Sequence, residues 1–294
     1  MSTDQSSWPS LAEDHILLKF HARLPKIIEE AGHSDIWGVK LSTAEPPEFS
    51  TLIILQKYLR STSNDLEKSV VNLTKTLKWR KEFGLDKKKE QGTEEEEDFG
   101  PDFDGLGYVT KVGKDNGRDD IVTWNVYGAV KDLKKPFGDL QRFLRWRIGL
   151  MEKAISYLHL EKATIPIHDS SSTATETNNI DIYKIDQIHL YGGVSFLRMD
   201  PLVKSASKAT IEIFQNHYPE LLLRKFFVQV PLIMSWMFTA ISLFVSVETS
   251  KKFQVISYPT NLAKELGNPN DIPKELGGNG PDLKMLQQRL EGKI

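Results

Sequence analysis

The sequence predicts an α/β protein in which an N-terminal helical bundle precedes a mixed, largely parallel sheet covered by helices. Apolar residues recur at helical spacing up to residue 85, and strand-like segments alternate with helical ones beyond Gly105. The chain has 294 residues, 39% hydrophobic and 27% charged, which is typical of a globular protein of about two domains. The succession of strand, helix and strand favours parallel pairing.

The first domain is predicted to span residues 11–85, after a flexible N-terminus of residues 1–10. Its apolar residues follow the period of amphipathic helices, and Gly84 is a plausible C-cap of the last one. The predicted helices lie within residues 15–20, 24–28, 52–59 and 65–83. Together they predict a small helical bundle.

A charge run follows the bundle and separates it from the second domain. Residues 86–98 are rich in lysine and glutamate, which indicates a solvated linker, with an interaction tail as the alternative. We therefore assign residues 86–103 to a charged linker and residues 104–280 to the second domain. Residues 281–294 are assigned to a C-terminal helix or tail.

The second domain is predicted to begin with a hairpin, because Gly113 to Gly117 separate two strand-like segments. A helix and a loop rich in Ser, Thr and Asn follow, and strands and helices then alternate. The predicted elements are strands at 108–112 and 121–127, a helix at 137–160, the loop at 168–179, a strand at 185–196, a helix at 202–217, a strand at 226–230, an apolar helix at 232–247 and a strand at 253–257.

The uncharged run from Phe226 to Val247 has the length of a transmembrane segment. Pro231 divides it into a strand-like piece and an apolar helix of about 16 residues, or about 24 Å, which is short for a bilayer core of about 30 Å. This helix is apolar nearly all round, so it is a core helix, the lid of an apolar cavity or a membrane-surface element. We expect no membrane span.

Composition and motifs exclude several functions. With 38 Lys and Arg against 40 Asp and Glu, the chain lacks the basic excess of nucleic-acid-binding proteins. It has no cysteine and no secretory signal, which favours the cytoplasm. Gly105 and Gly107 lack a third glycine at Thr110, and Gly193-Val-Ser195 lacks the closing glycine of a nucleophile elbow. No common enzyme class is indicated, and no catalytic residue is assigned.

A series of ordered signatures resembles the CRAL-TRIO lipid-binding proteins, and most closely the fungal phosphatidylinositol transfer proteins. The signatures are Leu55-Gln-Lys-Tyr-Leu-Arg60, Phe143-Leu-Arg145, Gly193-Val-Ser195, His217-Tyr-Pro-Glu220, Val230-Pro231, Glu248-Thr249-x-x-Lys252-Phe253 and Ile272-Pro-Lys-Glu-Leu-Gly-Gly278. The resemblance implies that the sheet floors a cavity for one lipid. It also implies that the apolar helix is a gate over the cavity, with Met234, Trp236, Phe238 and Phe244 on it.

The resemblance also implies a headgroup site for phosphatidylinositol at Glu220, Thr249 and Lys252. A lysine supplies charge and donors to a phosphate, and a threonine hydroxyl adds a hydrogen bond. The alternative is a structural ion pair between Glu220 and Lys252. Thr62 and Ser63 replace a basic pair of the family, and Leu190 replaces its usual aspartate, so phosphatidylcholine exchange is not expected.

The alternation of the strand at Gln187 places His189 and Tyr191 on one face and Leu190 on the other. Imidazole and phenolate are both ligands of haem iron. One divergent haem-binding homologue in this family has a His-x-Tyr pair that matches His189 and Tyr191, although Thr62 stands where it has a further tyrosine. The resemblance therefore implies ferric haem b bound through Tyr191 and His189. The alternative is a hydrogen-bonded pair in a lipid pocket.

Two classes of function remain open at this point. The first is a non-enzymatic carrier or sensor of phosphatidylinositol, haem or either in turn, with a role in phosphoinositide homeostasis or a haem-linked stress response. The second is a haem-dependent, peroxidase-like enzyme. The resemblance favours the carrier, in the cytoplasm and peripheral on endoplasmic reticulum or microsomal membranes.

Overall fold

The computed structural model describes residues 8, 11–85, 97–114, 117–167, 181–194, 200–230 and 247–294. Four predicted segments lie wholly or largely outside these ranges, namely the N-terminus at 1–10, the charged run at 86–98, the loop at 168–179 and the apolar helix at 232–247. The expectations for these segments, and for the gate residues Met234, Trp236, Phe238 and Phe244, stay predictions.

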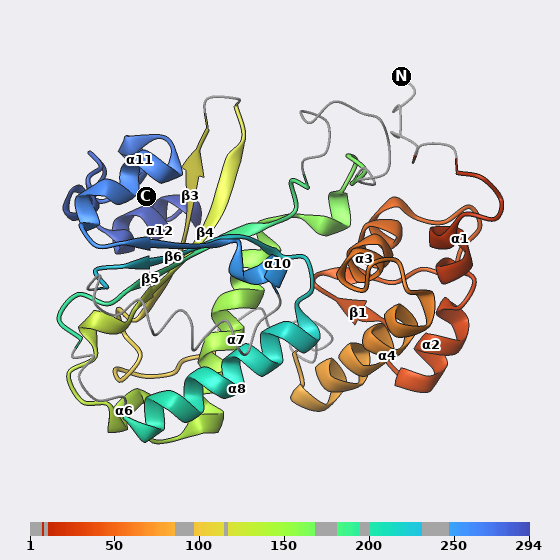
Figure 1. Ribbon diagram of the computed structural model, residues 1–294, viewed down its shortest axis with the longest axis horizontal. Helices are drawn as coiled ribbons and strands as arrows, with labels where there is room; N and C mark the ends of the chain where they lie inside the picture. Colours follow the sequence, from red (N-terminus) through yellow and green to blue (C-terminus); the bar gives the residue numbers. More distant parts are fainter. Residues whose placement is uncertain are drawn as a thin grey trace. The chain divides into compact units, whose positions relative to one another are not determined.

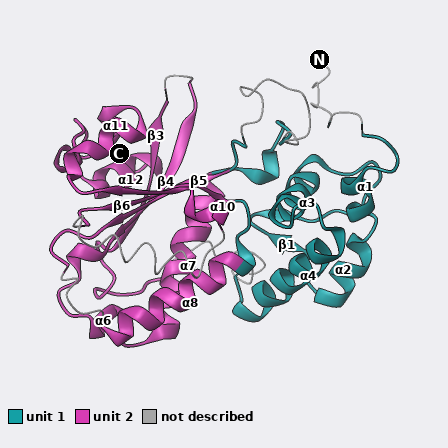
Figure 2. Ribbon diagram, in the orientation of Figure 1, with its two compact units in different colours: residues 1–96, 158–183, 216–220 teal, residues 97–157, 184–215, 221–294 magenta. Residues whose placement is uncertain are grey.

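The chain folds into two compact units (Figure 2). Unit 1 comprises Met1–Glu96, Leu158–Tyr183 and Asn216–Glu220, and unit 2 comprises Glu97–Tyr157, Lys184–Gln215 and Leu221–Ile294. Two short segments from the predicted second domain thus belong to the N-terminal unit. Side-chain contacts hold them there: Lys57 pairs with Asp181, and Trp79 stacks on His217.

Unit 1 contains the predicted N-terminal helices (Figure 1). They are α1 (Ile16–His21), α2 (Leu24–Ala31), α3 (Phe49–Ser61) and α4 (Leu66–Phe83). The Asp65 carboxylate accepts a hydrogen bond from the Lys68 backbone N–H at the start of α4, and Gly84 ends that helix with a φ of 78°. Thr62 lies in the turn between α3 and α4, where its hydroxyl is 2.7 Å from that of Ser69.

Unit 1 also contains a small antiparallel hairpin, β1 (Asp35–Ile36) with β2 (Val39–Lys40), that the sequence did not predict. Its two-residue turn is Trp37-Gly38, and both residues have positive φ, 52° and 81°. Such a turn is favoured when glycine occupies one of its central positions. Strands of two residues are too short for a period-2 pattern to reveal.

Unit 2 is built on a five-stranded sheet in the order β3-β4-β5-β6-β7. β3 and β4 form the predicted antiparallel hairpin, and the other neighbours pair in parallel. The predicted mixed, largely parallel sheet is confirmed. The strands are β3 (Gly107–Gly113), β4 (Asp119–Val126), β5 (Ile185–Leu190), β6 (Leu222–Val228) and β7 (Phe253–Ile256).

Helices lie on both sides of this sheet, with α7 and α8 on one side and α11 and α12 on the other (Figure 1). The predicted helix at 137–160 is divided, because Asp139 caps a new helix at Leu140. The helices beyond β4 are η1 (Tyr127–Ala129), α6 (Lys134–Phe137), α7 (Leu140–Ser156), η2 (Leu160–Lys162), α8 (Pro201–His217), α10 (Val247–Ser250), η5 (Pro259–Asn261), α11 (Leu262–Leu266), η6 (Pro269–Asp271), η7 (Lys274–Leu276) and α12 (Leu283–Leu290).

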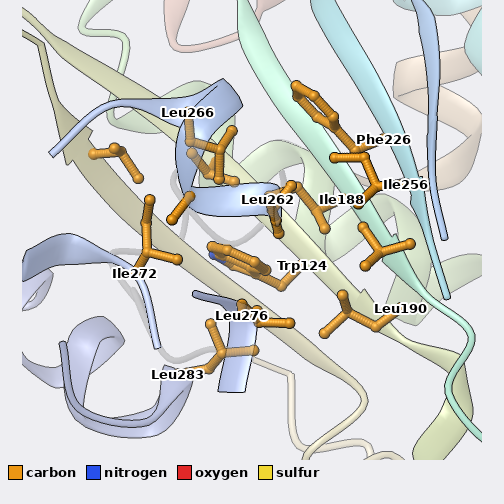
Figure 3. Packing of buried hydrophobic residues seen from close by; sticks show 14 residues of the cluster. Trp124, Ile188, Leu190, Phe226, Ile256, Leu262, Leu266, Ile272, Leu276 and Leu283 are labelled. Carbon is orange, nitrogen blue, oxygen red and sulfur yellow. The ribbon is translucent and has the colours of Figure 1, made fainter. Parts of the chain in front are cut away.

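One face of the sheet, here called the core face, is covered by the C-terminal segment (Figure 3). Trp124, Ile188 and Phe226 project from three adjacent strands into this core, and Leu262 and Leu276 pack against them. At the edge, the Gln287 side chain accepts a hydrogen bond of 2.8 Å from the Val109 backbone N–H of β3. The C-terminal segment thus completes the domain.

The strand half of the uncharged run is β6, which ends at Val228. Its continuation from residue 231 to 246 lies outside the described residues. Within the described ranges, we find no helix with the length and apolar character needed to cross a membrane.

Candidate ligand site

The second face of the sheet, here called the inner face, carries the predicted His189 and Tyr191. On β5 the side chains alternate, so Gln187 and His189 leave on the inner face while Ile188 and Leu190 enter the core cluster. The Tyr191 N–H donates to Val228 O at 3.0 Å and so continues the pairing one residue past the strand. The structure thus confirms the prediction that His189 and Leu190 lie on opposite faces of the sheet.

His189 and Tyr191 lie within reach of each other, with His189 Nδ1 3.3 Å from the Tyr191 hydroxyl. His189 is only 7% exposed, and its Nε2 atom has no hydrogen-bond partner among the residues that the structure describes. Burial, with the charges of Lys225 and Arg147, lowers the pKa of His189 well below 6.5, so the imidazole is neutral. Its second ring nitrogen is therefore a buried polar atom that a ligand could use.

Aromatic rings surround this pair. The Tyr127 ring lies edge-on to His189 with centroids 5.3 Å apart, and the Phe227 ring is stacked near Tyr191 at 6.4 Å and 10°. Burial, followed by the neighbouring Tyr127, raises the pKa of Tyr191, against the opposing charge of Arg147. The phenol is therefore held neutral in this structure. Only a strong positive charge close to its oxygen would favour the phenolate.

Two cationic side chains share the inner face. Arg147 of α7 is 1% exposed, and its guanidinium is 3.5 Å from Gln187 Oε1 and 4.7 Å from the Phe214 ring centroid. Lys225 of β6 is partly buried, with Nζ 5.5 Å from the Phe227 ring centroid. Burial, followed by the charge of Arg147, lowers the pKa of Lys225 to about 7. The inner face is therefore positive as well as aromatic.

The predicted headgroup residues fall in both units. Thr249 lies in α10 and Lys252 just before β7, both in unit 2, and the Lys252 N–H donates to Thr249 O at 3.1 Å. Glu220 belongs to unit 1, has a φ of 56°, and accepts a hydrogen bond of 2.9 Å from Lys57 Nζ on its backbone carbonyl. The structure thus brings Thr249 and Lys252 together on one short turn.

Lys57 lies in the Leu55–Arg60 signature, but the sequence analysis did not single it out for a role of its own. Its ammonium is fully buried and donates to Asp181 Oδ2 at 2.9 Å, to Tyr183 O at 2.8 Å and to Glu220 O. His217, three residues before Glu220, stacks on Trp79 with centroids 4.2 Å apart, and burial followed by the charge of Arg80 lowers its pKa to about 4. These contacts fix the backbone on which Glu220 stands.

Arg147, Lys225 and Tyr127 were also missed as site residues. Lys225 is two residues before Phe227 on β6, and Tyr127 is two residues after Asn125 of β4. Because side chains two positions apart on a strand lie on the same face, alternation alone would have placed both Lys225 and Tyr127 on the inner face. Arg147 comes from a helix, and no local pattern shows which strand its side chain contacts.

Comparison with known proteins places this architecture in a family. Residues 107–278 match the model of the CRAL/TRIO domain, which covers more than half of the chain. The protein therefore belongs to the CRAL/TRIO family, as its motifs suggested.

The proteins that the chain resembles include fungal proteins that share one name. The chain is 60% identical over 292 residues to "Phosphatidylinositol transfer protein SFH5" of Cryptococcus neoformans var. neoformans serotype D, covering 99% of this chain and 96% of that one. It is 47% identical to the protein of the same name from Phaeosphaeria nodorum, covering 98% and 83%. A solved structure, "Crystal structure of Sfh5", has a TM-score of 0.75 at 29% identity, and the match covers 94% of this chain and 93% of that one.

Proposed function

We propose that this protein binds phosphatidylinositol and transfers it between membranes as a non-enzymatic carrier. The relatives named above are phosphatidylinositol transfer proteins, and one of them is 60% identical over nearly the whole chain. The observation that supports a site is the short turn that carries both Thr249 and Lys252, whose hydroxyl and ammonium would bind one phosphate. The assignment of Glu220 to the same headgroup comes from the resemblance of the His217-Tyr-Pro-Glu220 motif alone.

The test is transfer of labelled phosphatidylinositol between vesicles. Lys252→Ala removes a charge-assisted hydrogen bond, so it should weaken binding about 10- to 150-fold. Lys251→Ala is the matched control, because Lys251 is the exposed neighbour and is not assigned to the site. Wild-type transfer by a folded Lys252→Ala protein would exclude the headgroup assignment.

The gate belongs to the same proposal. Met234, Trp236, Phe238 and Phe244 would cover the bound lipid and touch the membrane during exchange. Charged residues at Phe238 and Phe244 should block exchange and leave the sheet folded, as circular dichroism would report. Unchanged transfer rates would exclude the gate role.

A second ligand, ferric haem b, is favoured by one specific observation: buried His189 Nε2 has no hydrogen-bond partner in the described part of the chain, and Tyr191 lies beside it. The described residues contain no group of three His, Asp or Glu side chains suited to a bare metal ion. A porphyrin supplies four nitrogens itself, so two protein ligands suffice. The neutral imidazole fits this role directly, and the charge of iron would have to overcome the raised pKa of Tyr191.

The experiment is the absorption spectrum of the purified protein, with hemin titration. We expect a coloured ferric protein, and Tyr191→Phe should greatly reduce haem retention while sparing stability. His189→Ala should alter the spectrum more than the occupancy. Tyr108→Phe is the control, since it removes the hydroxyl of a tyrosine that packs against the core face and is not assigned to the site. A colourless protein that takes up no hemin, or a Tyr191→Phe protein with the wild-type spectrum, would end the haem proposal.

A peroxidase assay distinguishes the carrier from the enzyme. In the presence of an electron donor, a haem-dependent enzyme would consume peroxide faster than free hemin does, and a carrier would not. We also propose a cytoplasmic protein, peripheral on endoplasmic reticulum or microsomal membranes, in phosphoinositide homeostasis or a haem-linked stress response. Carbonate extraction tests the peripheral association, because a peripheral protein is released.

A further inference from the structure

Two buried polar atoms on the inner face have no hydrogen-bond partner among the residues that the structure describes. They are Nε2 of His189, a residue that is 7% exposed, and Oδ1 of Asn125, a residue that is 0% exposed. Burial of a polar group without a partner costs free energy, and such groups are rare in folded proteins. Two of them on one face therefore point to a place that a polar group of a ligand occupies.

The sheet brings these two side chains together. Asn125 of β4 and His189 of β5 are partners in the parallel register of the two strands. Paired residues leave a sheet on the same face, and neighbouring strands lie about 4.8 Å apart, so one small group can contact both side chains. Both residues stand near the carboxyl ends of their strands, which is where open α/β sheets bind their ligands.

The orientation of the Asn125 amide is fixed by its backbone contact. Its Nδ2 atom donates a hydrogen bond of 3.3 Å to the Ile188 carbonyl oxygen. Because a carbonyl oxygen only accepts, the amide nitrogen has to face it, and Oδ1 is the atom left without a partner. Asn125 therefore offers an acceptor, which only a hydrogen-bond donor can satisfy.

His189 offers the complementary group. Its Nδ1 atom is 3.3 Å from the Tyr191 hydroxyl, and a phenol that donates to Nδ1 leaves the imidazole proton on Nε2. The Nε2–H group is then a donor beside the acceptor of Asn125. A hydroxyl group accepts one hydrogen bond and donates another, so it matches this pair. A carboxylate or a phosphodiester does not, because it has no proton to donate to Oδ1.

We propose that Asn125 Oδ1 and His189 Nε2 form a hydroxyl-binding subsite on the inner face, which takes the O–H group of a neutral lipid alcohol. The rings of Tyr127 and Phe227, with centroids 5.3 and 5.7 Å from that of His189, supply apolar surface beside it. A lipid alcohol is neither ligand of the proposed function, so this inference goes beyond that function. The alcohol and haem would both use His189 Nε2, so the binding of one excludes the other.

The experiment measures how labelled hexadecanol, and labelled hexadecane that lacks the hydroxyl, distribute between phosphatidylcholine vesicles and the protein. Asn125→Leu keeps the size of the side chain and removes the acceptor. Thr123→Val is the matched control, because Thr123 lies two positions earlier on β4 and its hydroxyl also donates to a β5 carbonyl oxygen, Asp186 O at 3.4 Å. Circular dichroism verifies that the variants are folded.

Wild-type protein should take up hexadecanol, and Asn125→Leu should reduce this uptake about 5- to 150-fold while uptake of hexadecane stays the same. Thr123→Val should change neither. His189→Phe keeps a ring and removes the donor, so it should also reduce the uptake of hexadecanol alone. It is the second variant on which the test rests if Asn125→Leu does not fold.

Unchanged uptake of hexadecanol by the folded variants at Asn125 and His189 would mean that the two atoms hold only a water molecule, and it would overturn the proposal. An equal loss of both ligands, or the same loss in Thr123→Val, would overturn it as well, because the effect would then be one of packing. A wild-type protein that transfers phosphatidylinositol but takes up no hexadecanol would refute the subsite and leave the proposed function intact. The reverse result would refute the proposed function and support the subsite.

Discussion

Lys57→Met is expected to destabilise unit 1 strongly, because it leaves a carboxylate buried without its cation. The Lys57 and Asp181 side chains are 0% and 2% exposed and join Nζ to Oδ2 at 2.9 Å. Removal of one partner of such a pair costs about 3–5 kcal/mol. Two further acceptors, Tyr183 O and Glu220 O, also lose this donor. We therefore place Lys57→Met at the upper end of that range.

The reverse change should be nearly as costly, since Asp181→Leu leaves the ammonium buried. Asp181 Oδ1 also accepts a hydrogen bond of 2.9 Å from the Tyr183 N–H, which this variant loses. In the double variant Lys57→Met/Asp181→Leu neither charge remains. The loss of stability in this variant should therefore be smaller than the sum of the two single losses by about 2 kcal/mol or more.

Hydrogen exchange of the α3 amides is the suitable assay, because it reads the opening free energy of this unit separately from the sheet unit. Phosphatidylinositol transfer should fall with Lys57→Met, since the carbonyl of Glu220 loses its donor. The reasoning is refuted if Asp181→Leu changes the opening free energy by less than about 1 kcal/mol, or if the double variant costs the full sum.

Three further predictions concern single contacts. Burial lowers the pKa of His217 to about 4, whereas in the unfolded chain the same imidazole takes up its proton near pH 6.5. The free energy of unfolding should therefore decrease as the pH falls from 6.5 to 4, and urea unfolding of His217→Gln should show a smaller decrease. Burial lowers the pKa of Lys225 to about 7 from 10.5, so the unfolded chain binds more protons between these values and stability should rise with pH across them. Lys225→Met should abolish that rise in stability, as measured by urea unfolding. Given the partial exposure of the side chain, it should also raise the free energy of unfolding by about 1–3 kcal/mol at pH 7. Gln287→Ala leaves the buried Val109 N–H without its acceptor, at a cost of about 1–3 kcal/mol, and faster exchange of that amide would verify it.

Local patterns were sufficient for the sheet and for part of the site. The Gly113 to Gly117 segment predicted the hairpin, and alternation along β5 predicted that His189 and Leu190 leave on opposite faces. Such signals depend on residues a few positions apart, where backbone geometry fixes the direction of each side chain. The resemblance of the motifs then supplied the family, which the match over residues 107–278 confirms.

Contacts between distant residues could not be predicted in this way. Lys57 and Asp181 are 124 positions apart, and the sequence around each is ordinary for a helix and a loop. Arg147 and Gln187 are 40 positions apart, on a helix and a strand whose relative rotation depends on packing. The segments 158–183 and 216–220 join unit 1 through such contacts, so a partition by position along the chain could not place them.

Under the proposed function, the two faces of the sheet have separate roles, one in stability and the other in ligand binding. On β6, Arg224 and Lys225 are adjacent in sequence, yet the first is neutralised by Asp186 and Asp120 in the core face and the second repels Arg147 on the inner face. Because alternation separates such neighbours, a substitution on the inner face leaves the C-terminal core intact. His189 beside Leu190 repeats this arrangement on β5. Single substitutions on the inner face of such a sheet can therefore alter which ligand it binds. The packing of the core face, which stabilises the sheet, stays the same.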